Sequence, residues 1–125
     1  MERRRPPFAT GRLVSDYGPI YRYWEALRAK GRQDLLERAT LNEDDFGFVD
    51  RLVRSTPSMT LLELIDALKV RFRDRVDPAI ASEALGMDPE AAVEVLTSIL
   101  AGWLVEAAEG FKVLGLRSRF RMPED

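Results

Sequence analysis

Apolar residues recur at helical spacing in several separate stretches of the chain, and this periodicity predicts a mainly α-helical protein. The clearest stretch follows the i, i+3, i+4, i+7, i+11 pattern and predicts a helix over residues 61–73. Its apolar members are Leu61, Leu64, Ile65, Leu68 and Phe72. Thr60 and Glu63 stand at its start with the spacing of a capping box, which fixes where this helix begins.

Three further helices are predicted before this one. Gly18-Pro19 opens a helix that runs to about Lys30, and its apolar stripe is the most aromatic part of the chain. A short helix follows over residues 32–39, and Asn42 caps a third over residues 43–54. The aromatic stripe, with Tyr21 and Trp24, either packs back on its own domain or pairs with a second copy of the chain.

Residues 77–115 carry two successive helix signals separated by a tight turn. Asp77 and Pro78 start a helix that ends at Gly86, and Asp88 and Pro89 repeat the same start signal. The second helix is expected to run towards Gly102. Its predicted core residues are Ala92, Leu96, Ile99, Leu100 and Trp103.

A small β-hairpin is predicted after the second helix. Residues 103–107 and 111–114 flank a turn at Glu109-Gly110, and apolar or small residues alternate with arginines over residues 116–121, as in an edge strand. A short strand at Arg75-Val76 would pair with this hairpin.

This order of elements resembles the winged helix-turn-helix superfamily over residues 59–121. The resemblance implies a mainly α winged helix-turn-helix fold with a small β-hairpin wing, preceded by an N-terminal helical arm. The corresponding division is a flexible basic arm over residues 1–14, a helical extension over residues 15–56 and a winged-helix domain over residues 57–121. The fold serves both DNA-binding and protein-binding proteins, so it does not decide the function.

Composition excludes the common catalytic and metal sites. The 125 residues include no cysteine and no histidine, which removes the usual nucleophile–base pairs and the thiolate or imidazole zinc sites. No glycine-rich phosphate loop occurs. We therefore expect neither an enzyme nor a cofactor or metal site. The acidic run Glu43-Asp44-Asp45 fits the positive end of a helix dipole better than a metal site.

Neither a secretory signal nor a run of about 18–20 apolar residues is present in the sequence. These observations, together with the absence of cysteine, favour a cytoplasmic protein with no membrane partner.

The net charge of −2 conceals a strong polarity along the chain. Residues 77–109 hold seven acidic side chains and no basic one. The second helix of a DNA-binding helix-turn-helix lies in the major groove, where base edges and phosphates require donors. Here its outward positions are expected to be Glu90, Ala91, Glu94, Thr97, Ser98 and Ala101. Repulsion from phosphate therefore disfavours DNA binding through this helix.

Two functions remain. In the first, the chain is a non-enzymatic interaction module, a small subunit or adaptor of a larger assembly, for which association with nucleic acid stays open. It would dock a protein through Glu83, Glu90 and Glu94, with Tyr21 and Trp24 as a second contact.

The alternative is a winged-helix transcriptional regulator that grips DNA through a basic surface and the N-terminal arm. The basic candidates are Arg71, Arg73, Arg75, Lys112, Arg117, Arg119 and Arg121. An acidic face and a basic face on one small domain would also allow head-to-tail self-association.

Overall fold

The computed structural model describes residue 14, residues 16–56 and residues 58–113, with the backbone alone for residues 109–113. The helices in this part of the chain are α1 (Gly18–Ala29), α2 (Gln33–Arg38), α3 (Glu43–Ser55), α4 (Leu61–Arg73), α5 (Pro78–Leu85) and α6 (Pro89–Val113). The mainly α prediction is confirmed for the described residues, and these contain no strand.

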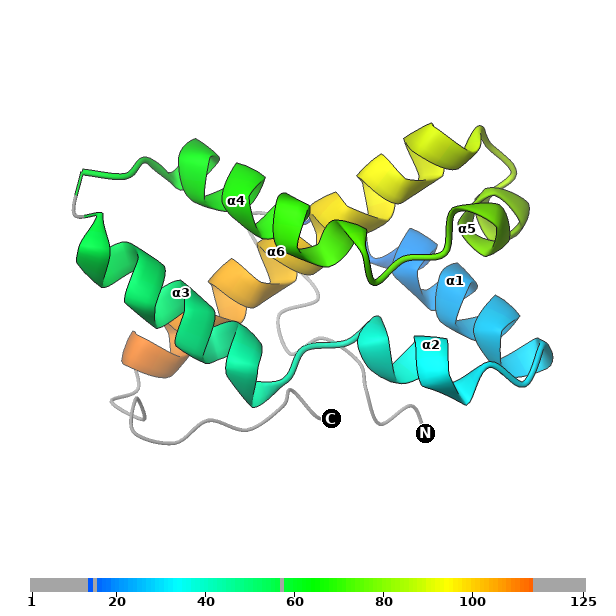
Figure 1. Cartoon of the computed structure of the whole chain (residues 1–125), viewed down its shortest axis with the longest axis horizontal. Coiled ribbons are helices and arrows are strands. Elements are labelled where there is room, and N and C mark those ends of the chain that lie inside the picture. The colour runs from blue at the N-terminus through cyan, green and yellow to red at the C-terminus, as the bar shows by residue number, and fades with distance from the viewer. Residues whose placement is uncertain (1–13, 15, 57, 114–125) are drawn as a thin grey trace.

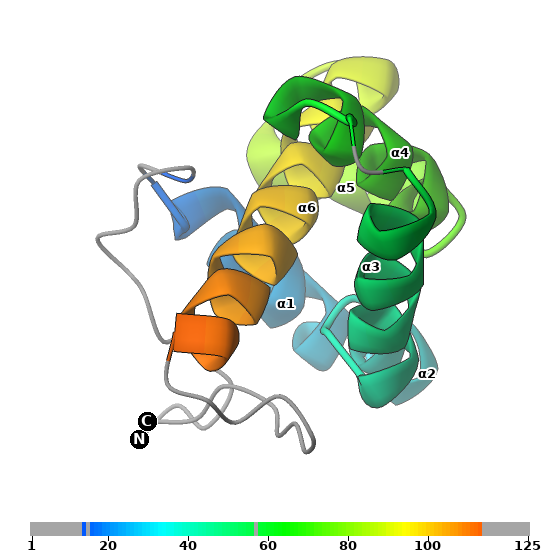
Figure 2. The same ribbon diagram turned by 90° about the vertical axis from the view of Figure 1, so that its left-hand side faces the viewer.

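Helix α6 runs through the middle of the molecule, and the other helices pack around it. Figure 1 shows α3 and α4 towards one end of the molecule and α1, α2 and α5 towards the other. Figure 2, turned by 90°, shows α6 between α1 and the α3–α4 pair. Helix α6 makes its most extensive contacts with α4 and α5. The helix-turn-helix formed by α5 and α6 is therefore packed directly against α4.

The predicted helix starts at Asn42, Thr60 and Asp77 are confirmed. Each of these side chains accepts a hydrogen bond from the backbone N–H three residues later, and the first two form complete capping boxes. Gly86 ends α5 in the left-handed conformation, with φ of 64° and ψ of 40°. Local sequence chemistry therefore sets these boundaries.

The predicted β-hairpin is wrong for residues 103–113, because α6 continues through them as one helix to Val113. Trp103, Leu104 and Ala107 are buried and extend the apolar stripe of Leu96 and Leu100 at helical spacing. A glycine inside a helix costs only about 1 kcal/mol relative to alanine. Burial of this stripe outweighs that cost, so Gly102 does not end the helix.

Two further strands were predicted, at residues 75–76 and at residues 116–121. Residues 75 and 76 form a turn between α4 and α5, in which the Arg75 N–H donates to the Phe72 carbonyl. The predicted edge strand over residues 116–121 lies outside the described residues.

Helix α1 packs into the same hydrophobic core as the helices that follow it. Trp24 and Trp103 are both fully buried, with ring centroids 5.9 Å apart and the rings edge to face. The Trp24 Nε1 also donates to the Ala39 carbonyl at 2.9 Å. Of the two alternatives for the aromatic stripe, the structure therefore shows the first, with the helix packed on its own domain.

The burial of Trp24 corrects its assignment as a partner contact, whereas the assignment of Tyr21 stays a prediction. Trp24 has no exposed surface, and Tyr21 is half-buried with its ring edge to face on Trp24 at 5.5 Å. A fully buried ring cannot meet a partner without unfolding of the helix. These aromatic residues hold α1 on the core.

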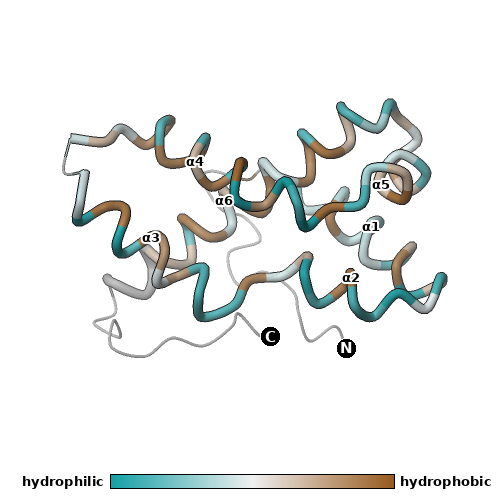
Figure 3. The backbone as a smooth tube through the Cα atoms, in the orientation of Figure 1, coloured by the Kyte–Doolittle hydropathy of each residue, from teal (hydrophilic) through white to brown (hydrophobic). Residues whose placement is uncertain are grey.

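Helix α6 is rich in apolar residues because it lies in the middle of the molecule. The expectation that the sequence holds no apolar stretch of membrane-spanning length is wrong, because an 18-residue window within Pro89–Ala108 is apolar enough to cross a membrane, with a mean hydropathy of 1.5. In the folded chain, however, 72% of that window is buried. Hydrophobic and hydrophilic positions alternate along the surrounding helices, which cover it (Figure 3).

Candidate functional site: the acidic turn between α5 and α6

The turn between α5 and α6 is held by backbone hydrogen bonds at the end of α5. The Gly86 and Met87 N–H groups both donate to the Ser82 carbonyl, at 2.9 and 3.3 Å. The Gly86 bond is that of an αL C-cap, and the Met87 bond is the 6→1 bond of a Schellman motif. The Ser82 hydroxyl donates back to the Met87 carbonyl at 2.6 Å. The backbone of the turn is thus fixed, while the Met87 side chain remains 38% exposed.

Two carboxylates follow the exposed methionine in the chain. Asp88 caps α6 by accepting from the N–H groups of Glu90 and Ala91, at 3.0 and 3.4 Å. Glu90 follows in the first turn and is exposed. Within the described part of the chain, no lysine or arginine forms an ion pair with either carboxylate. Asp88 has a structural role, whereas none of the described contacts requires the Glu90 side chain or the Met87 side chain.

Glu83 and Glu94, the other two carboxylates predicted to bind a protein, each form an ion pair with a lysine from another part of the chain. Lys30 lies 3.1 Å from Glu83, and Lys69 of α4 pairs with Glu94 of α6. The hydrogen bond from Lys69 holds the pKa of Glu94 below its ordinary value. Glu83 and Glu94 therefore form the partly neutralised edges of a surface whose uncompensated centre is Asp88 and Glu90. We call Met87, Asp88 and Glu90 the acidic turn.

The prediction of which α6 residues face outward is correct for the first turns of the helix and wrong for the later turns. Glu90, Ala91 and Glu94 are exposed and Ser98 is half-buried, but Thr97 and Ala101 are buried. The Thr97 hydroxyl donates to the Val93 carbonyl at 2.8 Å, so its polar group is satisfied inside the helix. These positions are covered because α6 is surrounded by helices rather than lying at the edge of the fold.

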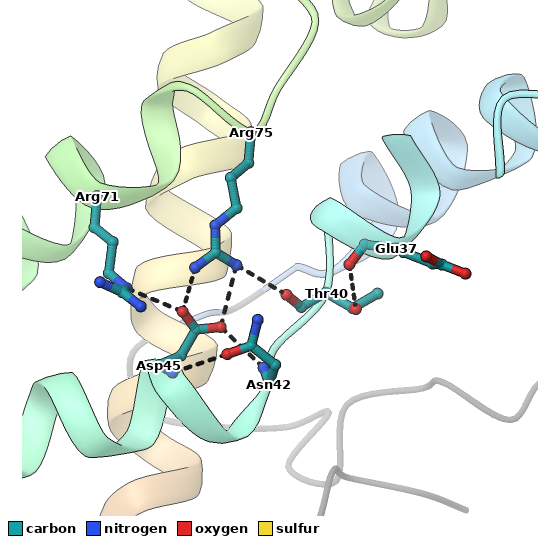
Figure 4. A network of polar contacts seen from close by, with 6 residues as sticks. All are labelled: Glu37, Thr40, Asn42, Asp45, Arg71 and Arg75. Atoms are coloured by element: carbon teal, nitrogen blue, oxygen red, sulfur yellow. Dashed lines mark hydrogen bonds and ion pairs between the residues drawn. The ribbon is translucent and has the colours of Figure 1, made fainter. Parts of the chain in front are cut away.

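Arg71 and Arg75 are not free to bind nucleic acid, which corrects their predicted role. Both pair with the fully buried carboxylate of Asp45 near the start of α3 (Figure 4). The Arg71 Nε donates to Asp45 Oδ1 at 2.9 Å, and Arg75 binds both oxygens of the same carboxylate. Their side chains are only 25% and 14% exposed.

The remaining basic candidates are scattered. Arg73 is exposed at the end of α4. Lys112 belongs to α6 rather than to a wing. Arg117, Arg119 and Arg121 lie outside the described residues. The described part of the chain therefore does not bring the predicted basic surface together.

Sequence reasoning missed Asp45 as a buried anion. The run Glu43-Asp44-Asp45 suggested helix capping, and Asp45 does accept the Asn42 N–H at 2.9 Å. The available signal was the spacing of Arg71 and Arg75, which places two guanidinium groups on one face of α4 and its following turn. Nothing in the sequence indicated that α3 would bring a carboxylate to that face.

Glu106 is a second missed buried carboxylate. It is 5% exposed and accepts hydrogen bonds from the Tyr17 hydroxyl at 3.1 Å and the Val14 N–H at 3.2 Å. Burial, followed by the charge of Glu106, raises the pKa of Tyr17 far above its ordinary value. A glutamate within the apolar run of α6 was the one sequence signal. Its role is to fasten the chain before α1 to the central helix.

The described residues contain no group of three or more acidic side chains placed to hold a metal ion. Comparison of the chain with family models, curated proteins and solved structures finds no match. No match supports the winged-helix resemblance, and helix replaces the predicted wing over residues 103–113.

Proposed function

We propose that this chain is a non-enzymatic interaction module, a small subunit or adaptor of a larger assembly, that docks a protein partner through the acidic turn. The observation that supports this proposal most directly is the combination of a fixed backbone with side chains that no described contact uses. Met87 and Glu90 are exposed on a turn whose Gly86 N–H, Met87 N–H and Met87 carbonyl are all hydrogen-bonded to Ser82. A rigid surface of this kind binds with little loss of conformational entropy.

The chemistry of the acidic turn defines the partner. Methionine offers a polarizable apolar contact that adapts to the opposing surface. Asp88 and Glu90, which follow it in the chain, add negative charge that attracts a basic surface and repels phosphate. The helix-turn-helix scaffold is therefore proposed to present a protein-binding surface, and nucleic acid would reach the assembly through the partner.

Affinity capture with a paired set of full-length variants tests this function. We expect Glu90→Arg combined with Met87→Ser to abolish capture of the partner by removing both the charge and the apolar contact. Asp44→Arg is the matched control, because Asp44 is also an exposed carboxylate at the second position of its helix. The control should capture the partner as the unaltered chain does.

Two results would contradict the proposal. One is a double variant that retains every interaction of the unaltered chain. The other is a protein that shifts duplex DNA at about 50 mM salt, where phosphate contacts are strongest, and binds it more tightly after Glu90→Arg. The second result would favour the regulator alternative.

A further inference from the structure

A groove of about 380 Å³ lies between the chain that enters α1 and the middle of α6, and its lining on α6 begins at Glu94, four residues after Glu90. Its volume is near the lower end of the 300–1,000 Å³ range of ligand sites. The apolar part of its lining is Val14, Pro19, Val95 and Ile99, and the polar part is Asp16, Glu94 and Ser98. The groove thus joins an apolar floor to a rim with two carboxylates.

Both walls of the groove are held in place by named contacts. Glu106 accepts the Val14 N–H, which fixes the N-terminal wall against α6. Asp16 accepts the Gly18 N–H at 2.8 Å and is exposed. On the other wall, Lys69 hydrogen-bonds to Glu94. The carboxylates are therefore positioned before any ligand arrives, which lowers the entropy cost of binding.

The groove is continuous with the acidic turn along one face of α6. Ala91, Glu94, Val95 and Ser98 follow i, i+3, i+4, i+7 spacing, so they form a single stripe that begins beside Glu90. A segment that contacts the acidic turn and continues along this stripe enters the groove. Its charge must complement Asp16 as well as Asp88 and Glu90.

We propose that the groove binds an extended basic segment of the protein partner, with an apolar side chain on Val95 and Ile99 and a lysine or arginine beside Asp16. This inference rests on the proposed function and names the chemistry of the partner. The apolar floor supplies burial. Lys69 already pairs with Glu94, so Asp16 is the rim carboxylate that selects cationic segments over acidic ones. The acidic turn and the groove then act as two parts of one linear binding surface.

Titration of the isotope-labelled full-length protein with a short peptide of alternating arginine and leucine tests this proposal. Amide signals of Val95, Ser98 and Ile99 should shift on binding, and a peptide with glutamate in place of arginine should leave them unchanged. Asp16→Asn keeps an acceptor for the Gly18 N–H and removes only the charge. We expect it to weaken the peptide at least fivefold, and Ser98→Arg to weaken it further by occupying the groove.

Asp66→Asn is the matched control, since Asp66 is an exposed carboxylate on α4 that does not line the groove, and it should bind the peptide normally.

A peptide that shifts none of the groove amides, or that binds Asp16→Asn and Ser98→Arg unchanged, overturns the proposal. If capture of the partner still depends on Glu90 in that case, the proposed function stands without the groove. A variant with Arg3, Arg4 and Arg5 changed to alanine that binds the peptide far more tightly would assign the groove to the chain's own N-terminal segment, and would also overturn the proposal.

Discussion

Asp45 joins two helices through one carboxylate, and the strength of that junction follows from its burial. It is fully buried, closes the capping box of α3 and receives hydrogen bonds from Arg71 and Arg75. Each guanidinium also lies over an aromatic ring, Arg71 over Phe48 at 4.5 Å and Arg75 over Phe72 at 4.7 Å. Removing the central anion would leave both largely buried guanidinium groups without an opposite charge, although Arg75 would keep its hydrogen bond to the Thr40 carbonyl.

Asp45→Ala should therefore lower the free energy of unfolding by about 3–5 kcal/mol, the usual cost of breaking a buried ion pair from one side. Chemical denaturation of the variant measures this loss. Asp44→Ala, at the exposed neighbouring position, should cost less than about 1 kcal/mol because it loses only an interaction with the helix dipole. Equal effects of the two substitutions would show that the buried network does not stabilise the fold.

The ion pair between Lys69 and Glu94 has a pH signature of a definite sign. Because the pKa of Glu94 is lowered in the folded protein, the pair stabilises the fold above the unfolded value of about 4.3, and this contribution is lost as the pH falls through the folded pKa. Glu94 is 51% exposed, so the contribution is less than about 1 kcal/mol. In Lys69→Met, the pKa of Glu94 measured by carboxyl NMR should rise towards its ordinary value. An unchanged pKa would show that Lys69 is not its cause.

The turn between α5 and α6 depends on one backbone conformation that only glycine adopts readily. A Cβ on Gly86 would meet nothing within 4 Å, so the cost of a side chain there comes from the positive φ alone. Gly86→Ala should reduce the free energy of unfolding by about 1–2 kcal/mol. Gly86→Asn should cost less, because asparagine tolerates the left-handed region.

Gly47, inside α3, is the matched control for this prediction. Its added Cβ would lie 3.3 Å from the movable Nη1 of Arg51, and its helical backbone suits alanine. Gly47→Ala should therefore stabilise the protein by up to about 1 kcal/mol in the same denaturation experiment. A loss at Gly47 as large as that at Gly86 would contradict the conformational explanation.

Helix starts were predictable because their signals are local. Asn42, Thr60 and Asp77 cap their helices through atoms only three residues away, so the sequence contains the whole interaction. The end of α6 was not predictable in this way. Gly102 and Gly110 are typical helix-stop signals, and only the burial of Trp103 and Leu104 among other helices carries the chain past Gly102.

At the scale of the whole molecule, the charged groups of the candidate site were predictable where they depend on local helical register and not where they depend on distant partners. The sequence correctly predicts exposed carboxylates at Glu90 and Glu94, since their helical register follows from the apolar stripe. It could not predict that Lys30 and Lys69 would pair with Glu83 and Glu94, because each pair joins segments far apart in the chain. Of the four carboxylates, Asp88 and Glu90 have no lysine or arginine partner in the described part of the chain, whereas Glu83 and Glu94 do.

The shared core has a further consequence for docking. Residues from Val14 to Ala107 contribute to one hydrophobic cluster, in which α1 and α6 meet through Trp24 and Trp103. The acidic turn and the groove are therefore attached to the same packed unit. A partner that spans both surfaces meets them in a fixed relative position, which favours binding without rearrangement.

Site-specific photo-cross-linking in the native cell tests the central claim most directly. A benzophenone amino acid at Ala91, which is exposed beside Glu90, should cross-link a protein partner, and the cross-link should disappear when Glu90→Arg is added. The same group at Arg51, exposed on α3, should give no such product. Cross-linking of that partner at Arg51 but not at Ala91, or of nucleic acid alone at Ala91, would contradict docking through the acidic turn.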